Sequence, residues 1–374
     1  MRRVRTVRLP AMANAHSHAF QLDLRGVAER PHPGDDFWSW RTAMYRLAAA
    51  HDPESMRAVG ERVYRVMAAA GYGAVGEFHY VVHQPDGTPY PEPNAMAMAL
   101  ADAAVACGLE IVLLPAAYAR GGFGVPASAG QARFCDPSVD AFLERLDRLR
   151  VWAADRTEVH VGAAVHSVRA VPAPWISTVA EYAERHDLVR HVHAAEQVRE
   201  LEECQAEHGC SPIELLSRCG YLGPRTSVVH GIHVSDRDIA LVAESDAIVV
   251  TCPTTEGNLG DGVFPGLRYR AAGVRMAIGT DSQVRIDPFE ELREMETLAR
   301  RDGQTRDALL AAAGGDLWGT VAGAGRQSLG LRPDGGGAIE LDLDHPDLVG
   351  VADADMALAL ATCASAGAVV GLRR

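Results

Sequence analysis

The chain contains no lysine, because all 36 of its Lys and Arg residues are arginine. This absence excludes chemistry that depends on a lysine amine: the Walker A phosphate loop, the pyridoxal phosphate Schiff base and the ATP-binding lysine of protein kinases. The glycine-rich stretches 121–124 and 335–337 are therefore predicted to be loops and not phosphate-binding cradles.

Long apolar runs, a secretory leader and paired cysteines are also missing. No uninterrupted apolar stretch is long enough to span a bilayer, and the basic start is not followed by the apolar segment of a signal peptide. None of the seven cysteines belongs to a Cys-x-x-Cys pair, which predicts reduced thiols in the cytoplasm. The formal net charge of −13 argues against nucleic acid and membrane partners. We therefore expect a cytoplasmic protein that handles a small molecule.

Eight short apolar runs alternate with longer amphipathic segments, and a hydrophobic content of 48% is enough for a sizeable core. Most runs are rich in Val, Ile and Ala, as in parallel strands that are covered on both faces. The clearest helix is expected over 53–70, where Asp52 can cap its start and Gly71 can end it. Another helix is expected from Asp287 onwards. The predicted strands are 10–15, 74–79, 110–118, 158–165, 189–193, 226–230, 246–252 and 275–280.

Eight strand–helix repeats predict an α/β fold, a (β/α)8 barrel of the TIM type over residues 10–330. After about residue 330 the chain becomes rich in Gly and Asp, and 338–343 has the pattern of a strand. Residues 331–374 are therefore expected to form a C-terminal appendage, a reduced small β element built from the chain ends. The long segment 19–51 after the first strand is expected to be a lid or a substrate clamp.

Six of the eight predicted strands end in polar residues suited to catalysis or binding. In a (β/α)8 barrel the active site lies at the carboxyl ends of the strands, so these side chains are expected to converge. They are His16 and His18 after the first strand, Glu77, His79 and Tyr80 after the second, His166 and Arg169 after the fourth, His193 and Glu196 after the fifth, His230 after the sixth, and Asp281 after the eighth.

The side chains of His16, His18, His193 and Asp281 predict a single metal site. Three imidazole nitrogens and one carboxylate suit one catalytic divalent ion, Zn²⁺ or Fe²⁺, that keeps a position open. A binuclear centre in such a barrel normally needs a bridging carbamylated lysine, which this chain cannot supply. One of these histidines alone would more often be a hydrogen-bonded residue at the barrel mouth, but the set of four favours a metal.

Glu196 follows His193 by three residues and is predicted to act as a general acid and base. It could take a proton from the attacking water and pass it to a leaving nitrogen. The alternative for Glu196 is an ordinary glutamate in the first turn of a helix. His230 is a candidate to orient the water beside Asp281, although a lone histidine there would more often be a core residue.

Six motifs occur in order over roughly residues 11–300: NAHSHAFQ (14–21), FWSWR (37–41), GEFHY (76–80), HSVRAV (166–171), HAAEQ (193–197) and CPTTEGNLGDG (252–262). Together they resemble the N-formimidoyl-L-glutamate deiminase family, which lies in the metal-dependent deaminase branch of the amidohydrolase superfamily. They are far more specific than a lone His-x-His pair.

This resemblance implies hydrolysis of N-formimidoyl-L-glutamate to N-formyl-L-glutamate and ammonia, a step of histidine degradation. It implies a (β/α)8 barrel with one divalent ion, usually Zn²⁺, held by the four side chains named above, and catalysis by Glu196, His230 and Asp281. Related barrels commonly dimerise, so a homodimer is expected. The family's substrate-binding residues correspond to Gln21, Arg41, Tyr80, His166 and Arg169. The two arginines independently suit a dicarboxylate substrate.

The chain departs from the family pattern at a few positions. Gln283 stands where a histidine is expected, and Leu22-Asp23-Leu24 replaces an arginine-containing stretch. Only 15 residues precede the first histidine of the pair, where the family has a longer β-rich segment. These departures affect substrate preference and stability more than the predicted metal set.

Three other functions remain open at this stage. A deaminase of guanine or another aromatic amine would need aromatic stacking, for which Trp38, Trp40 and Tyr80 are available although aromatics are only 6% of the chain. Cleavage of the same substrate to formamide and glutamate usually belongs to an arginase-like fold with two metals. A metal-binding protein without turnover would be expected to have lost a ligand or the acid.

Overall fold

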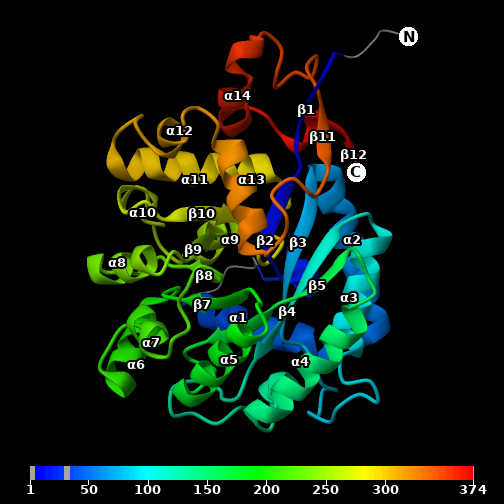
Figure 1. Cartoon of the computed structure of the whole chain (residues 1–374), viewed down its shortest axis with the longest axis vertical. Coiled ribbons are helices and arrows are strands. Elements are labelled where there is room, and N and C mark those ends of the chain that lie inside the picture. The colour runs from blue at the N-terminus through cyan, green and yellow to red at the C-terminus, as the bar shows by residue number, and fades with distance from the viewer. Residues whose placement is uncertain (1–4, 29–33, 374) are drawn as a thin grey trace.

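The structure is a computed structural model that describes residues 5–28 and 34–373. Its centre is a parallel barrel surrounded by helices, which confirms the predicted (β/α)8 fold (Figure 1). The barrel strands are β2 (Met12–Ser17), β3 (Tyr72–His79), β4 (Glu110–Ala117), β5 (Val159–Val161) continued by β6 (Ala163–Ser167), β7 (Arg190–Ala194), β8 (Thr226–His230), β9 (Ile248–Thr251) and β10 (Arg275–Ile278).

Backbone hydrogen bonds join the segment after β10 to β2 and so close the barrel. The amide nitrogens of Thr280 and Asp281 donate to the carbonyl of His16 at 3.1 and 3.0 Å, and the amide of His18 donates to the carbonyl of Asp281 at 3.0 Å. The closing seam therefore runs through three of the predicted metal ligands. The first strand was predicted two residues early, because Pro10 ends a separate strand and β2 continues to Ser17.

The helices form the outer layer of the barrel. Helix α2 begins and ends as predicted, because the carboxylate of Asp52 and the hydroxyl of Ser55 make reciprocal capping bonds and Gly71 adopts a left-handed φ of 107°. The helices are α1 (Phe37–Ala50), α2 (Pro53–Ala70), α3 (Ala95–Ala106), α4 (Val139–Ala153), α5 (Ala173–Arg185), α6 (Val198–His208), α7 (Pro212–Arg218), α8 (Asp236–Glu244), α9 (Pro253–Leu259), α10 (Gly266–Ala271), α11 (Pro288–Gly303), α12 (Leu309–Ala312), α13 (Leu317–Ser328) and α14 (Met356–Thr362).

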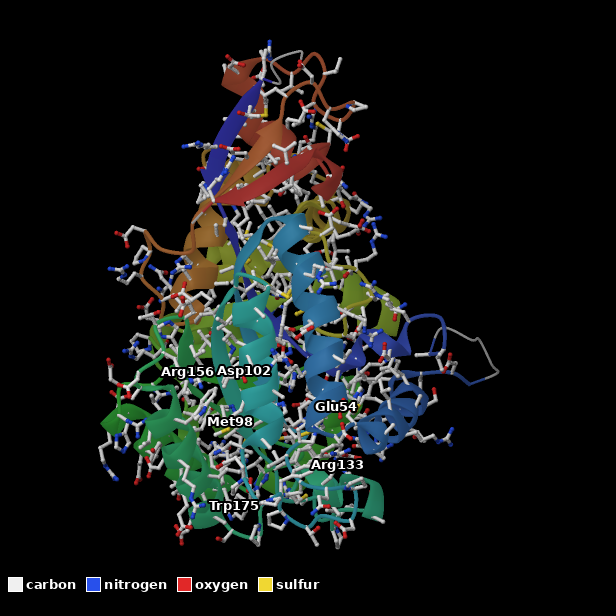
Figure 2. All side chains as sticks on the ribbon, turned by 90° about the vertical axis from the view of Figure 1, so that its right-hand side faces the viewer. Glu54, Met98, Asp102, Arg133, Arg156 and Trp175 are labelled. Carbon is white, nitrogen blue, oxygen red and sulfur yellow. The ribbon has the colours of Figure 1, made fainter. Side chains whose placement is uncertain are left out.

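Figure 2 shows α2 and α3 side by side on one flank of the barrel, with Glu54 at the start of α2 and Met98 and Asp102 on α3. Asp102 reaches Arg156 at 3.5 Å, a partly exposed pair that links α3 to the turn before β5. Such a surface pair contributes little to stability. The apolar face of α2, with Met56, Val59 and Val63 fully buried, carries the packing against the barrel.

A small antiparallel sheet is built from the two ends of the described chain. Its order is β1 (Thr6–Pro10), β11 (Ala338–Asp342) and β12 (Val369–Arg373), and Figure 1 shows it beside α14 at the top of the view. Side-chain atoms of Ile339 and Val369 lie 3.4 and 3.6 Å from the position that a Cβ on Gly71, the residue before β3, would take. The sheet therefore packs beside the amino end of β3, away from the strand ends that carry the predicted site.

Within residues 5–28 and 34–373, no helix has both the length and the apolar character that a bilayer span requires.

Candidate active site

The four predicted metal ligands meet at the carboxyl ends of β2, β7 and β10. The Nε2 atom of His193 lies 3.1 Å from Nε2 of His16 and 3.3 Å from Nε2 of His18. Oδ1 of Asp281 lies 3.4 Å from Nε2 of His16 and 3.4 Å from Nε2 of His18. A tetrahedral ion with bonds of about 2.0–2.1 Å separates its ligand atoms by roughly 3.3–3.4 Å. The four atoms therefore fit the corners of one metal site.

Hydrogen bonds orient two of these imidazoles. The Nδ1 atoms of His18 and His193 lie 2.8 Å from the carbonyl oxygens of Phe78 and His166, so each Nδ1 donates and each Nε2 presents a lone pair to the site. Burial, with the neighbouring imidazoles, lowers the pKa of His16 and His193 far below the usual value. Burial also lowers the pKa of His18 to about 4. Neutral imidazoles with aimed lone pairs are what a cation requires.

His230 ends β8 and contacts three carboxylates. Its Nδ1 lies 3.1 Å from Glu256, while its Nε2 lies 3.6 Å from Glu196 and 3.9 Å from Asp281. Burial alone would lower the pKa of His230, but these carboxylates outweigh it and raise the pKa to about 10. Burial, with the carboxylates of Glu196 and Glu256, raises the pKa of Asp281 to about 7 despite His230. His230 therefore lies at the centre of a buried acidic cluster beside the four ligands.

Glu196 follows β7 and is held by Arg169, which follows β6. Nη2 of Arg169 donates to Oε2 of Glu196 at 2.7 Å, and both side chains are only 7% exposed. Burial by itself raises the pKa of Glu196, but His230 and Arg169 together lower it, so the carboxylate is ionised. The buried carboxylate of Glu200 accepts the amide hydrogens of Ala195 and Glu196 and fixes this turn.

The predicted substrate residues line one pocket above the four ligands. Nε2 of Gln21 donates to the Tyr80 hydroxyl at 3.0 Å, which leaves Oε1 of Gln21 buried and without a partner among the described residues. Nη1 of Arg169 is likewise buried and unpartnered in the described part of the chain. The pocket lining comprises these three residues with His18, Phe37, Trp40, Arg41, Met44, Tyr45, Tyr118, Gly121, His166, Ser167, Ala170, His193, Glu196, His230, Leu259 and Asp281.

Helix α1, from the long segment after β2, brings Arg41 to this pocket. The guanidinium lies over the rings of Trp38 and Tyr45, with centroid distances of 4.5 and 5.6 Å. Within the described ranges Arg41 forms no ion pair, so its charge is available to an anionic ligand. The predicted lid segment thus forms a wall of the pocket, although its residues 29–33 lie outside the described residues.

Buried groups fix this wall to the barrel. Arg133, labelled in Figure 2, donates to the carbonyls of Ala48 and His51 at the end of α1, and to that of His83 after β3. Gln131 donates to the hydroxyls of Tyr45 and Tyr118 at 3.2 and 2.8 Å. The helix that carries Arg41 is therefore anchored and not loosely attached.

A chain of buried hydrogen bonds lies directly behind the ligands. Nε2 of Gln283 donates to Ser17 at 3.0 Å, and Ser17 donates to Glu77 at 2.7 Å. Oε1 of Gln283 accepts from the Thr280 hydroxyl at 2.8 Å, and that hydroxyl accepts from Asn14 at 2.7 Å. This network connects β2, β3 and the turn after β10, and so fixes the spacing between the His16–His18 strand and Asp281.

Most of the residues predicted at the strand ends lie together in the structure, but the side chains of two of them face away from the pocket. Glu77 belongs to the network behind the ligands, and His79 is buried near Arg145 and Arg133, where burial lowers its pKa to about 3. Side chains alternate along a strand, so Phe78 and Tyr80 face the site while Glu77 and His79 point away. Sequence reasoning missed Glu256, Glu200 and Asp261, although two of them lie in or beside quoted motifs.

Comparison with known proteins agrees with this geometry. A family model described as amidohydrolase family matches residues 7–313. The chain is 40% identical over 328 residues to formimidoylglutamate deiminase of Pseudomonas aeruginosa, covering 86% of this chain and 72% of that protein. It is 30% identical over 360 residues to the 5-methylthioadenosine/S-adenosylhomocysteine deaminase of Halobacterium salinarum, covering 92% and 75%. An amidohydrolase crystal structure from Brucella melitensis superposes with a TM-score of 0.88 at 34% identity, covering 98% and 85%.

Proposed function

Because the chain belongs to the amidohydrolase family, we propose that it hydrolyses N-formimidoyl-L-glutamate to N-formyl-L-glutamate and ammonia. The reaction adds one water across the formimino carbon and breaks its bond to the terminal nitrogen. The 40% identity to a formimidoylglutamate deiminase supports this activity. By the same reasoning the protein acts in histidine degradation.

The observation that carries the proposal is a pair of available guanidinium groups in one pocket. The substrate has two carboxylates and a cationic formimino group. Arg41 has no ion pair among the described residues, and Arg169 has an unpartnered Nη1. Planar guanidinium groups are suited to binding carboxylates. Gln21, Tyr80 and His166 on the same walls can complete the hydrogen bonds.

The side chains of His16, His18, His193 and Asp281 would hold one divalent metal ion, and three imidazoles with one carboxylate favour Zn²⁺. Bound there, the ion would lower the pKa of a water molecule and so provide a nucleophile at neutral pH. The spacing of the four side chains and the neutral state of the three imidazoles fit this ion.

Proton transfer is assigned to Glu196. Its carboxylate is ionised in the free enzyme, so Oε1, the oxygen on the His230 side, can accept a proton from the attacking water. The same group then donates this proton to the nitrogen that leaves as ammonia. His230 and Asp281 lie within 4 Å of each other and border the position from which the water attacks. Together the three residues supply the general acid–base and orienting groups of an amidine hydrolase.

A deaminase of guanine or another aromatic amine is the second candidate. The aromatic side chains that line the pocket, Phe37, Trp40, Tyr45 and Tyr118, favour it. Two available arginines do not suit a neutral purine, which needs hydrogen-bonding groups and stacking instead. We therefore rank this activity below amidine hydrolysis.

Ammonia release from N-formimidoyl-L-glutamate by zinc-loaded protein tests the proposal, with guanine, 8-oxoguanine and 5-methylthioadenosine as alternative substrates. Turnover of the amidine, abolished in Glu196→Gln at unchanged zinc content, is the expected result. Folded, zinc-replete protein that releases ammonia only from a purine would establish the second candidate. No ammonia from any of the four compounds would refute both.

A further inference from the structure

Asp261 lies in the motif Gly260-Asp261-Gly262 at the end of α9, and the local backbone fixes its position. The flanking glycines have φ values of 69° and 127°, which side chains with a Cβ rarely adopt. A Cβ on Gly262 would meet Ile232 and His233 at 3.1 Å. The amide of Asp261 donates to the backbone carbonyl of Glu256 at 3.0 Å, and Nε2 of His233 donates to the Asp261 carbonyl at 2.6 Å. The sequence thus holds this carboxylate in one place.

Only one oxygen of the Asp261 carboxylate has a protein partner. Oδ1 accepts from Nε2 of Gln197, the residue after Glu196. Oδ2 is buried and has no hydrogen-bond partner among the described residues. The residue as a whole is 3% exposed. A buried carboxylate oxygen without a partner is costly, so a ligand group is expected to satisfy it.

The carboxylate of Asp261 lies beside Glu196 and His230. A carboxylate oxygen of Asp261, an oxygen of Glu196 and a ring nitrogen of His230 lie within 4.8 Å of one another. One nitrogen can bond two acceptors at about 2.9 Å each whenever those acceptors are less than roughly 5.8 Å apart. The two carboxylates can therefore hold a single nitrogen between them.

The substrate class of the proposed function supplies such a nitrogen, and the inference rests on that function. We propose that Asp261 is a further catalytic residue, whose Oδ2 accepts a hydrogen bond from the terminal amidine nitrogen while Glu196 binds the same nitrogen from its other side. This is the nitrogen that departs. The new bond joins the water oxygen to the formimino carbon, and the bond from that carbon to the terminal nitrogen breaks. One water proton passes through Glu196 to that nitrogen, which leaves as ammonia. The second water proton leaves the oxygen as the formyl group forms, so the cationic substrate yields ammonium overall.

Charge complementarity favours this placement. Burial and the Glu196 carboxylate raise the pKa of Asp261 to about 9 in the free protein. Burial and the negative charge of Glu196 both disfavour the ionised form of Asp261. A cation between the two carboxylates offsets both, because it pairs with the negative charge on Asp261. A neutral purine amine brings no such charge. Asp261 therefore selects for amidines, while Arg41 and Arg169 select for carboxylates.

The test compares a cationic and a neutral ligand in wild type and Asp261→Asn. The substrate carries the cationic formimino group, whereas the product N-formyl-L-glutamate carries a neutral formyl group and the same carboxylates. We expect kcat/KM for the substrate to fall about 10- to 100-fold, as for a lost charged hydrogen bond. The inhibition constant of the product should change less than about twofold. Zinc content and circular dichroism should match the wild type.

Asp136→Asn is the matched control, because Asp136 is also a buried aspartate but pairs with Arg145 outside the pocket. It should lower stability and leave the ratio of substrate to product affinity unchanged. Should Asp261→Asn fail to fold, Gln197→Leu removes the donor to Oδ1 instead and should raise KM severalfold without weakening product binding.

The outcomes separate the two proposals. Wild-type turnover with no change in either variant, or equal loss of substrate and product binding, overturns the role of Asp261 and leaves the proposed function standing. A wild type that does not turn over N-formimidoyl-L-glutamate overturns both.

Discussion

One edge of the Arg169 guanidinium donates to Oε2 of Glu196 at 2.7 Å, while its Nη1 remains buried without a partner in the described chain. The same planar group therefore contacts Glu196, the residue proposed for proton transfer, and offers a donor to the pocket. A carboxylate that binds Nη1 would be placed at a fixed distance from Glu196. In the proposed mechanism, substrate binding and proton transfer are thus connected through one side chain.

Replacing Arg169 by Gln should affect both functions. The substitution removes one of the two cations that offset burial, so the pKa of Glu196 rises although His230 remains. Because the reaction begins with ionised Glu196, the acidic limb of the kcat/KM profile should move to higher pH, and kcat/KM at neutral pH should fall by about 100-fold or more. A pH–rate profile of zinc-loaded protein measures this. A lower kcat/KM with an unmoved acidic limb would show that Arg169 binds substrate without influencing Glu196.

Arg41→Gln should raise KM by about 10- to 100-fold with a small change in kcat, because the proposal has its guanidinium bind a substrate carboxylate far from the reacting carbon. Steady-state kinetics on N-formimidoyl-L-glutamate gives both constants. Arg46→Gln is the control, since Arg46 lies on the exposed face of the same helix. An equal effect of both substitutions would indicate general electrostatics and not a contact.

Removing the metal should destabilise the protein. An ion whose free concentration is 1,000 times its dissociation constant stabilises the folded state by about 4 kcal/mol. A chelator should therefore lower the melting temperature by roughly 5 °C or more, and added zinc should restore it. His193→Gln should abolish the response to zinc. His79→Gln, which replaces a buried histidine outside the site, should retain it. A zinc response that survives in His193→Gln would place the ion elsewhere.

Gln283→Ala should weaken metal binding without touching a ligand. The substitution leaves the hydroxyls of Ser17 and Thr280 without one partner each, and such supporting contacts contribute about 10- to 100-fold in metal affinity. Competition with a chromophoric chelator measures the dissociation constant for zinc. Gln205→Ala, on the exposed surface of α6, is the control. Unchanged zinc affinity in Gln283→Ala would mean that the backbone seam alone fixes Asp281.

His191 should contribute to acid sensitivity. Burial lowers its pKa to about 4, against 6.5 in the unfolded chain. Between these values the unfolded state binds a proton that the folded state does not, so stability is complete above pH 6.5 and falls by about 3 kcal/mol as the pH drops to 4. The free energy of unfolding, measured in urea, should depend less steeply on pH in His191→Gln. Between pH 4 and 6.5 the slope should fall by the amount that corresponds to one proton. A slope that matches the wild type would contradict the neutral buried state.

The sequence predicted those features that depend on local pattern. The barrel strands were found because covered parallel strands are continuous apolar runs, and α2 was placed correctly because its capping residues are adjacent to it. The four candidate ligands were expected to converge because the strand ends of a barrel do, and the structure brings them together. Their roles remain predictions that the experiments above test.

Contacts between distant segments could not be predicted in the same way. The bond between His230 and Glu256 depends on where α9 lies relative to β8, and the position of Asp261 depends on two left-handed glycines. Side chains alternate along β3 and the residue that follows it, so His79 points outward and Tyr80 points inward. The sequence alone did not tell which of the two alternating sets faces the site. Gln283 was noted only as a departure, because its partners lie up to 266 residues away.

The seam between β2 and the segment after β10 also determines when the metal site can form during synthesis. Asn14 and Thr280, which bond across it, are 266 residues apart. At about 5–20 residues per second, a ribosome needs roughly 10–50 s to cover that distance. During this time the two N-terminal imidazoles of the nascent chain have no Asp281 to complete their site. Loading with the correct ion is therefore an event of the nearly finished polypeptide, after the last barrel strand has left the exit tunnel.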